Sequence, residues 1–454
     1  MKNSALNFLF SLLCLASVTT IKGQSVHRVD PPNWWSDFPL DTVEVFITGE
    51  GFTKAEIRSF KGAERLEWGI LSDHVAWVQF RILPNLASQE ITFKIGRRKI
   101  KYPLLERSGY QPQGLSDQDL IYLITPDRFH NGNPKNDDIK GMRERGTDLK
   151  EPYARHGGDL EGIGQGLGHI ERIGATAVWI NPLLENDMAR DSYHGYAITD
   201  HYQIDPRYGG NKGLAALSKQ MQERGLKHVA DVVYNHWGSS HYLQELMPDS
   251  SMVHWNQNGS IPYSSFRFTS LTDPYASKDD IDRFEKGWFA GAMPDLNQEH
   301  PLTASYLTYS TLWYIESFGV DALRCDTYAF SHPTFLKELN MLLKRVYPEL
   351  FIFGETWAYS EASQLYFAPN DNVSAGWTGN DAVTDFTLWR AIHSMYEADE
   401  SKQFGSNRTY SKNNTDLGSS KANCLPENEK PWHGEPPQKK STLPSISPFT
   451  SRTS

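Results

Sequence analysis

The chain has 454 residues, enough for two or three domains, and 39% of them are hydrophobic, as in a globular protein. The formal net charge is −10 and no block of Lys and Arg occurs, which argues against a nucleic acid partner. Aromatic residues make up 12% of the chain, a content that both large cores and sugar-binding surfaces can explain.

Residues 1–23 have the features of a cleaved signal peptide. Lys2 precedes an apolar run over residues 6–16, which is too short to span a bilayer, and no second long apolar run follows. We expect cleavage near residues 23–24 and export, to the periplasm in a bacterium with two membranes. Cys14 leaves a lipoprotein as the alternative, although Leu13 is a poor residue immediately before a lipidated cysteine.

Residues 24–107 are predicted to form a small immunoglobulin-like β-sandwich. The runs 43–47, 75–80 and 91–95 are rich in β-branched and aromatic residues, and turn residues separate them. Residues 108–117, rich in Gly, Pro and Gln, are typical of a linker.

Strands and helices alternate from Leu120 onward. Strands are predicted over 120–124, 175–180, 228–233, 319–326 and 350–355, with helices such as 211–224 and 334–345 between them, and residues 384–390 are a candidate sixth strand and its turn. Repeated units of this length predict a (β/α)8 barrel over residues 118–404.

Charged and polar residues stand at the carboxyl ends of three predicted strands. Arg324 and Asp326 are two residues apart, so they share one face of their strand. Glu355 ends another strand, and Asn235-His236 follow a third. A structural Arg–Asp ion pair would explain one strand end, but three such ends favour an active site, which in barrels lies at this edge.

Five short motifs resemble those of the α-amylase family of glycoside hydrolases (family 13), and within it the neopullulanase and cyclomaltodextrinase branch. They occupy residues 193–196 (YHGY), 231–236 (DVVYNH), 293–297 (MPDLN), 319–326 (GVDALRCD) and 353–357 (FGETW). The resemblance covers about residues 120–390. The N-terminal unit also resembles the extra domain of this branch, which implies a homodimer formed through that domain.

The resemblance implies a role for each matching residue. Asp326 is the expected nucleophile, Glu355 the general acid and base, and Arg324 the residue that orients Asp326. The substrate-binding residues implied are Tyr196 as a stacking platform, His194 and His236 as donors to sugar hydroxyls, and Tyr193 of the same motif. Burial at the end of an apolar strand should raise the pKa of Glu355, and two carboxyls about 5 Å apart would retain the anomeric configuration.

A calcium ion is the expected cofactor. One loop offers several oxygen ligands, as a hard cation needs, and together with a later loop it resembles the calcium site of cyclodextrin glucanotransferases. The implied ligands are Asn131, Asn133, Asn136, Asp137, Asp159 and the carbonyl of Gly157. Loops rich in Asn and Gly are also common as plain turns. Asn235 resembles a ligand of a different calcium site.

The C-terminal region departs from the family. No segment matches the motif of the seventh strand, whose Asp stabilises the transition state in the family, and residues 405–454 are polar and rich in Ser and Pro. We therefore expect an incomplete barrel that lacks its last two strands and the family's C-terminal β domain. It would be followed by a disordered tail, from a truncated or frameshifted reading or from natural divergence.

The expected activity is hydrolysis of α-1,4-glucosidic bonds in starch, pullulan or cyclodextrins by a retaining enzyme. Two alternatives stay open. A non-catalytic glucan-binding protein would keep the aromatic site without turnover, and a glucan transglycosylase would transfer the glucosyl chain to a sugar instead of to water.

Overall fold

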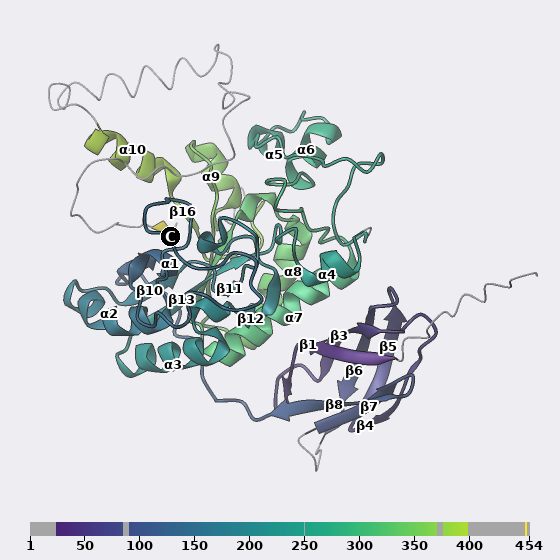
Figure 1. The fold of residues 1–454 in the computed structure, drawn as a ribbon. Helices are drawn as coiled ribbons and strands as arrows, with labels where there is room; N and C mark the ends of the chain where they lie inside the picture. The colour runs from purple at the N-terminus through teal and green to yellow at the C-terminus, as the bar shows by residue number, and fades with distance from the viewer. Residues whose placement is uncertain (1–23, 85–89, 249, 370–375, 398–449, 452–454) are drawn as a thin grey trace, which may run out of the picture.

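A computed structural model of the protein describes residues 24–84, 90–248, 250–369, 376–397 and 450–451. Figure 1 shows a small all-β part in purple and blue beside a larger part in which strands and helices alternate. The predicted signal peptide (1–23) lies outside the described residues, as does the predicted tail (405–454) except for residues 450–451.

The N-terminal part is a sandwich of two four-stranded sheets, which confirms the β-sandwich prediction. One sheet, in the order β1-β3-β6-β5, contains β1 (Ser25–Asp30), β3 (Thr42–Glu50), β6 (Val75–Ile82) and β5 (Ala63–Ile70). The other, in the order β2-β8-β7-β4, contains β2 (Trp34–Trp35), β8 (Arg98–Leu105), β7 (Glu90–Ile95) and β4 (Ile57–Lys61). In β8 the buried residues alternate with exposed ones, as expected of a strand with one face on a core.

The larger part is built on a sheet whose first six strands are parallel and lie side by side in chain order. They are β9 (Ile121–Ile124), β10 (Ala177–Ile180), β13 (Lys227–Val233), β14 (Ala322–Asp326), β15 (Phe351–Gly354) and β16 (Ala382–Thr384). A seventh strand, β17 (Thr450–Ser451), pairs antiparallel with β16. The predicted barrel architecture is therefore confirmed over six successive strands.

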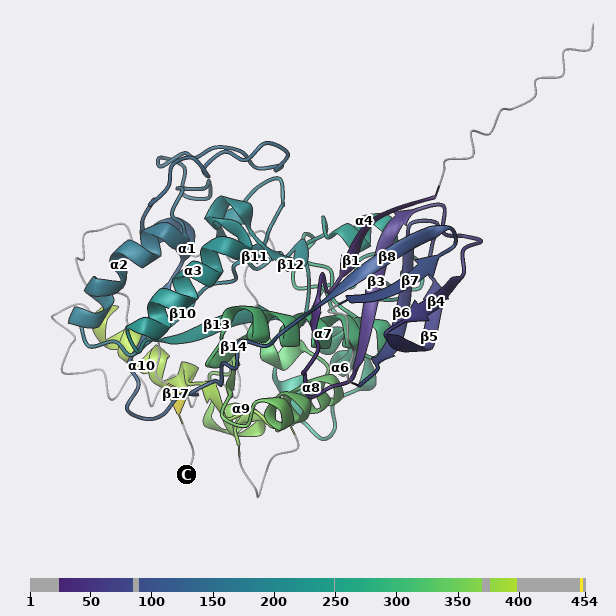
Figure 2. The same cartoon turned by 90° about the horizontal axis from the view of Figure 1, so that it is seen from below.

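Helices connect these strands and cover the outer face of the sheet (Figures 1 and 2). The α-helices are α1 (Pro126–Phe129), α2 (Leu160–Arg172), α3 (Gly210–Glu223), α4 (Tyr242–Leu246), α5 (Thr269–Thr272), α6 (Lys278–Glu285), α7 (Pro301–Phe318), α8 (Pro333–Val346), α9 (Glu361–Phe367) and α10 (Phe386–Glu397). Three short 3-10 helices are also present, η1 (Ser192–His194), η2 (Pro206–Tyr208) and η3 (Tyr328–Phe330). A separate two-stranded sheet is formed by β11 (Leu184–Glu185) and β12 (Asp200–Ile204). No helix in the described ranges is long and apolar enough to cross a membrane.

The predicted sixth strand was placed too late in the sequence. Strand β16 ends at Thr384, and the residues from Phe386 onward form helix α10. The Asp385 carboxylate accepts a hydrogen bond from the Leu388 amide at 2.8 Å, the bond that a helix-capping Asp makes. This capping bond directs residues 386–390 into a helix, although several of them also favour strands.

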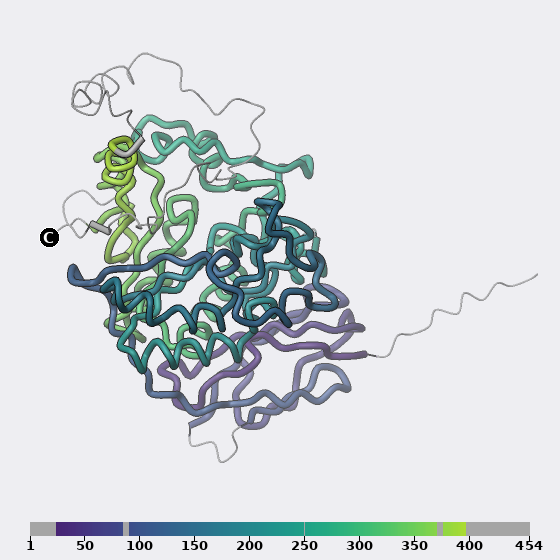
Figure 3. Tube along the Cα trace, turned by 60° about the vertical axis from the view of Figure 1, so that its left-hand side comes forward, coloured from purple at the N-terminus to yellow at the C-terminus, as the bar shows by residue number. Residues whose placement is uncertain are grey.

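Helix α7 joins the two parts of the protein. The tube view of Figure 3 shows the sandwich lying along one flank of the strand–helix part. Tyr306 of α7 packs edge-to-face on Phe46 of the sandwich, with 5.4 Å between ring centroids. Near the other end of the helix, Arg107 forms a two-point ion pair with the buried Glu316, with both bonds at 2.9 Å. The sandwich is therefore fixed to the barrel along most of α7.

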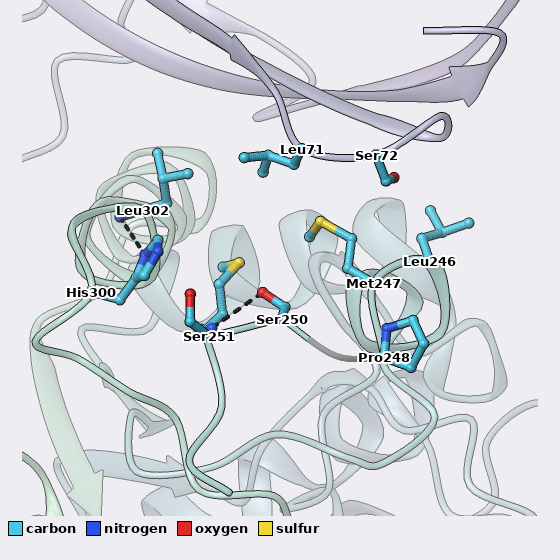
Figure 4. Close-up of a pocket in the computed structure, with 10 residues that line it drawn as sticks. Leu71, Ser72, Leu246, Met247, Pro248, Ser250, Ser251, His300 and Leu302 are labelled. Atoms are coloured by element: carbon cyan, nitrogen blue, oxygen red, sulfur yellow. Dashed lines mark hydrogen bonds between the residues drawn. The ribbon is translucent and has the colours of Figure 1, made fainter. Parts of the chain in front are cut away.

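The boundary between the two parts also contains an open cavity of about 430 Å³ (Figure 4). The turn at Leu71 and Ser72 closes it from the sandwich side, and residues 246–248 and 250–252 with the start of α7 close it from the barrel side. Its walls are mainly Leu, Met and Pro side chains. The two parts do not pack against each other at this cavity. Their direct contacts include those of α7 and those of strand β1, which are described below.

Glu44 on β3 is buried at this boundary, where its carboxyl accepts a hydrogen bond from the Ser305 hydroxyl. Burial raises the pKa of Glu44 from 4.5 to about 7, against the effect of that hydrogen bond. The stabilising contribution of the neutral carboxyl is complete below about pH 4.5 and is lost as the pH rises through about 7. We therefore expect this group to lower the free energy of unfolding by up to about 3 kcal/mol between pH 5 and pH 8.

Denaturant unfolding of Glu44→Gln at both pH values tests this expectation. The variant should lose most of the difference, whereas Glu64→Gln, at an exposed glutamate of β5, should keep it. An unchanged pH dependence in Glu44→Gln would show that other groups cause it.

Candidate active site

Four charged residues meet at the carboxyl edge of the parallel sheet. Asp231 near the end of β13 stands in register with Arg324 of β14, and Val233 stands in register with Asp326. Glu355 follows directly after β15, the next strand in the sheet. Because parallel strands end at a common edge, these residues from three separate segments form one cluster.

A single guanidinium holds the cluster together. Arg324 Nη1 donates to Asp231 Oδ1 at 2.7 Å and to Asp326 Oδ1 at 2.8 Å, and Arg324 Nη2 contacts Glu355 Oε1. The Arg324 side chain is only 4% exposed. Charge-assisted hydrogen bonds of this kind fix the orientation of each carboxyl group.

Three acids around one cation affect the pKa values of the cluster. Burial raises the pKa of Glu355, Arg324 opposes this effect, and the neighbouring Asp326 adds to it. Burial also raises the pKa of Asp231 to about 7, again against the effect of Arg324. The pKa values of Glu355 and Asp231 are therefore both raised, and a raised pKa is what a carboxyl that donates a proton in catalysis requires.

Thr327 connects Asp326 to Glu355. Its hydroxyl donates to Asp326 Oδ2 at 3.0 Å, and its backbone amide donates to Glu355 Oε2 at 3.1 Å. The backbone of Thr327 has φ of 43°, in the left-handed region that a β-branched residue rarely occupies. Sequence reasoning gave Thr327 no role, since nothing about a threonine after a strand signals this conformation.

Aromatic side chains lie over the cluster. Trp179 Nε1 donates to Asp231 Oδ2 at 2.9 Å, and the Tyr196 hydroxyl donates to the same oxygen at 3.1 Å. Asn181 Nδ2 donates to the Tyr196 hydroxyl at 2.8 Å. The Arg324 guanidinium lies 5.1 Å from the Trp179 ring and 5.7 Å from the Tyr196 ring. Sequence reasoning missed Trp179 and Asn181, although both stand at the end of a predicted strand.

The predicted substrate-binding histidines lie beside Tyr196. The His194 ring stacks on Tyr196 with centroids 5.8 Å apart, and its Nδ1 accepts a hydrogen bond from the Tyr196 amide at 2.9 Å. His236 is buried against Phe289, and burial lowers its pKa to about 4, so it is neutral at pH 7. The ring of Tyr193 instead lies under the Arg128 guanidinium, at 3.9 Å.

The structure also brings the predicted calcium ligands together. Asp159 Oδ2 accepts from the Asn133 amide at 2.8 Å and from Asn136 Nδ2 at 3.3 Å, and Asn131 Nδ2 lies 2.9 Å from both oxygens of Asp137. Among the described residues, no group of three or more His, Cys, Asp and Glu is placed to hold a metal ion.

Oxygen atoms that accept no hydrogen bond are present in this loop cluster. Asn131 Oδ1 and Asn136 Oδ1 are buried without a partner among the described residues. A hard cation prefers such amide, carbonyl and carboxylate oxygens. The chemistry of the residues therefore fits a calcium ion here, with few acidic ligands.

A second group of oxygens lies next to His236. The side-chain amide of Asn235 points one atom at Phe330 O, 3.0 Å away, and at Asp295 Oδ1, 3.1 Å away. If the amide oxygen of Asn235 faces these two acceptors, three oxygens converge, an arrangement that suits a bound cation. If the amide nitrogen faces them, it donates a hydrogen bond to each.

Comparison with known proteins gives a consistent family assignment. A family model described as the alpha amylase catalytic domain matches residues 123–378. A cyclomaltodextrinase of Bacillus sp. is 29% identical over 304 residues, which are 67% of this chain and 51% of that protein. The intracellular maltogenic amylase of Bacillus subtilis is 29% identical over 270 residues, covering 58% of this chain and 42% of that protein.

Neopullulanase 2 of Thermoactinomyces vulgaris is 30% identical over 243 residues, covering 52% of this chain and 38% of that protein. The chain thus spans about half the length, or less, of these curated relatives.

Proposed function

The chain belongs to the alpha-amylase catalytic-domain family, and on this basis we propose that it is a retaining hydrolase of α-1,4-glucosidic bonds in starch, pullulan or cyclodextrins. The observation that carries the proposal is the placement of the Asp326 and Glu355 carboxyls on one guanidinium. Sharing Arg324 keeps the two carboxyls close together, as the separation of roughly 5 Å in retaining glycosidases requires.

In the first step Asp326 acts as the nucleophile. One of its oxygens attacks the anomeric carbon, the bond to the glycosidic oxygen breaks, and the proton of Glu355 passes to that leaving oxygen. The products are a glucosyl ester on Asp326, a glucan with a free hydroxyl and an ionised Glu355. Arg324 and Thr327 hold Asp326 in position through one oxygen each.

In the second step a water molecule attacks the same carbon. Its proton passes to Glu355, the ester bond breaks, and Asp326 leaves as a carboxylate. The raised pKa of Glu355 suits both duties, since the group must give and then regain a proton near neutral pH. Two successive displacements leave the anomeric configuration unchanged.

Substrate binding is assigned to the side chains around the cluster. Tyr196 offers a ring face that Asp231 and Asn181 hold in place through its hydroxyl. His194 and His236 would bind sugar hydroxyls beside it, and Tyr193 of the same segment is a further candidate.

Release of products tests the proposal. Soluble starch and pullulan are incubated with the purified chain, and proton NMR of the first products reads the configuration of the new reducing end. We expect the α-anomer to appear first. The β-anomer would exclude retention, and binding to starch without any release would favour the glucan-binding alternative. Maltose added as an acceptor distinguishes transfer to a sugar from hydrolysis.

The cofactor proposed is calcium. Asn131, Asn133, Asn136, Asp137 and Asp159, with the carbonyl of Gly157, would hold one ion, and a second would lie among the oxygens of Asn235, Asp295 and Phe330. Calcium would supply structural support at both places, tying the first loop to helix α2 and the loop after β13 to the turn η3.

Removal of calcium should destabilise the protein. Dialysis against EGTA is expected to lower the melting temperature by roughly 5–10 °C, since a ligand bound only by the folded state stabilises that state. Asp137→Asn should reduce this shift and retain less calcium by elemental analysis. Asp138→Asn, at the exposed neighbour that pairs with Arg145, serves as the control and should behave as wild type. Equal melting temperatures with and without EGTA would contradict calcium binding.

Export and self-association complete the proposal. A signal peptide over residues 1–23 would place the enzyme outside the cytoplasm, and the sandwich would provide the contact for a homodimer. Mass spectrometry of the mature protein and sedimentation at micromolar concentration test these points.

A further inference from the structure

Two charged residues of the sandwich reach into the barrel. Arg28 and Asp30 lie at the end of β1, and Asp30 is only 2% exposed. Arg28 Nε contacts Asp30 Oδ2 at 2.5 Å, so the two side chains form one unit. Asp30 is buried whereas the Arg28 side chain is 31% exposed, and a buried carboxylate is costly unless partners satisfy its oxygens.

The barrel provides those partners from two separate segments. Arg28 Nη2 donates to Asp200 Oδ1 at 2.8 Å and Nη1 donates to Asp200 Oδ2 at 2.5 Å, which is a two-point ion pair. The Arg28 guanidinium also lies 4.4 Å from the Tyr242 ring, and the Tyr242 hydroxyl donates to Asp30 Oδ2 at 2.9 Å. One site on the sandwich therefore fixes both Asp200 and Tyr242.

Asp200 lies at the end of the segment that carries the aromatic platform. It is four residues after Tyr196, and residues 197–199 between them are buried. The Thr199 amide donates to Glu185 O at 2.7 Å, so the segment is also anchored to the edge strand β11. A displacement of Asp200 would therefore move a short, tightly packed piece of chain that ends at Tyr196.

Tyr242 lies at the end of the segment that carries His236. The two segments are joined by backbone bonds, from the Gly238 amide to Ile198 O at 2.7 Å and from the Tyr242 amide to Thr199 O at 3.3 Å. A side chain at Gly238 would come within 2.6 Å of Ala197 O, so this close approach requires glycine. Tyr196 and His236 thus lie on two segments that are hydrogen-bonded to each other. Both segments are also bonded to β1, through Asp200 and Tyr242.

We infer that Arg28 is a positioning residue of the active site, which sets the spacing between Tyr196 and His236 through Asp200 and Tyr242. The inference rests on the proposed function for its effect on substrate. The sandwich would then contribute to glucan binding without touching the substrate. A rival interpretation is that Arg28 only adds stability to the domain boundary.

Arg107 offers a matched control. It also forms a two-point ion pair from the sandwich side to a buried barrel carboxylate, but its partner Glu316 is on helix α7. Breaking either ion pair weakens the boundary, and only the loss of Arg28 should disturb residues 196–200 and 236–242. Arg28→Gln and Arg107→Gln are therefore compared, with Arg28→Lys as a milder variant if Arg28→Gln does not fold.

The first measurement is hydrogen–deuterium exchange, which does not depend on activity. We expect peptides that contain Gly238, Thr199 and Tyr242 to exchange about tenfold faster in Arg28→Gln and at the wild-type rate in Arg107→Gln. Equal rates in the two variants, or a change confined to β1, would overturn the inference.

The second measurement separates this inference from the proposed function. Binding of maltoheptaose is measured by calorimetry in an Asp326→Asn background, where turnover does not interfere. We expect Arg28→Gln to weaken binding about fivefold or more and Arg107→Gln to leave it unchanged. Unchanged binding in both variants would overturn the inference. If the background protein binds no maltoheptaose, the proposed function fails and the exchange data alone decide the role of Arg28.

Discussion

The Asp326→Asn variant is expected to lose turnover of soluble starch by roughly 10⁴-fold or more, the scale seen when a nucleophile is removed. An amide in place of the carboxylate keeps the shape of the side chain but cannot form the glucosyl ester. The contact from Arg324 Nη1 at 2.8 Å can be kept through the remaining oxygen, so the fold should be preserved. Reducing-sugar release measures the loss, and circular dichroism checks the fold.

Mass spectrometry gives an independent reading of the same assignment. Wild-type protein quenched during turnover should carry a glycosyl unit on the peptide that contains Asp326, and the variant should not. A variant that keeps more than about one hundredth of the wild-type rate would contradict the assignment of Asp326 as nucleophile. Wild-type protein that is folded and inert would instead favour the glucan-binding alternative.

The Glu355→Gln variant should lose between about 10²-fold and 10⁴-fold in rate on starch, the usual contribution of a general acid. In kcat/KM, which reports the first step alone, the loss should be much smaller on an aryl maltoside with an acidic phenol, since such a leaving group needs no proton; the second step, where Glu355 acts as the base, should stay slow on both substrates. The comparison of the two substrates therefore tests the role of the side chain and not only its presence.

The pH profile tests Glu355 in a second way. Burial raises the pKa of this carboxyl, which must be protonated in the first step, so kcat of the wild type on starch should fall as the pH rises through that raised pKa. The Gln variant should lack this decline, because its amide does not titrate. Equal losses of kcat/KM on both substrates, with the alkaline decline kept, would assign the acid to another group.

The positions of three of the four charged residues follow largely from the sequence, whereas Asp231 was not predicted to join them. Strands that are apolar until their last residues predict parallel strands buried on both faces, and the barrel rule then brings Arg324, Asp326 and Glu355 to one edge. What the sequence does not contain is the distance between side chains on different strands. That Arg324 touches all three acids depends on register and rotamers, which only the packed structure fixes.

Other features could not be predicted, for identifiable reasons. Arg28 and Asp200 are 172 residues apart, and neither belongs to a motif, so their contact has no local signal. The left-handed backbone of Thr327 occurs together with its bonds to Asp326 and Glu355, and it is a conformation that threonine itself disfavours. Helix α10, by contrast, was predictable from the sequence, because Asp385 is a typical residue to cap the start of a helix. The apolar residues that follow Asp385 also favour strands, and this led to the wrong prediction.

Helix α7 has a consequence for how this protein can evolve. The helix is buried nearly all round, with one flank on the barrel sheet and another on the sandwich through Phe46 and Arg107. A gene that lost the sandwich would leave a water-exposed apolar flank on α7, and a gene that exchanged it would have to match that flank residue by residue. The two parts are therefore expected to be inherited and to diverge as a pair.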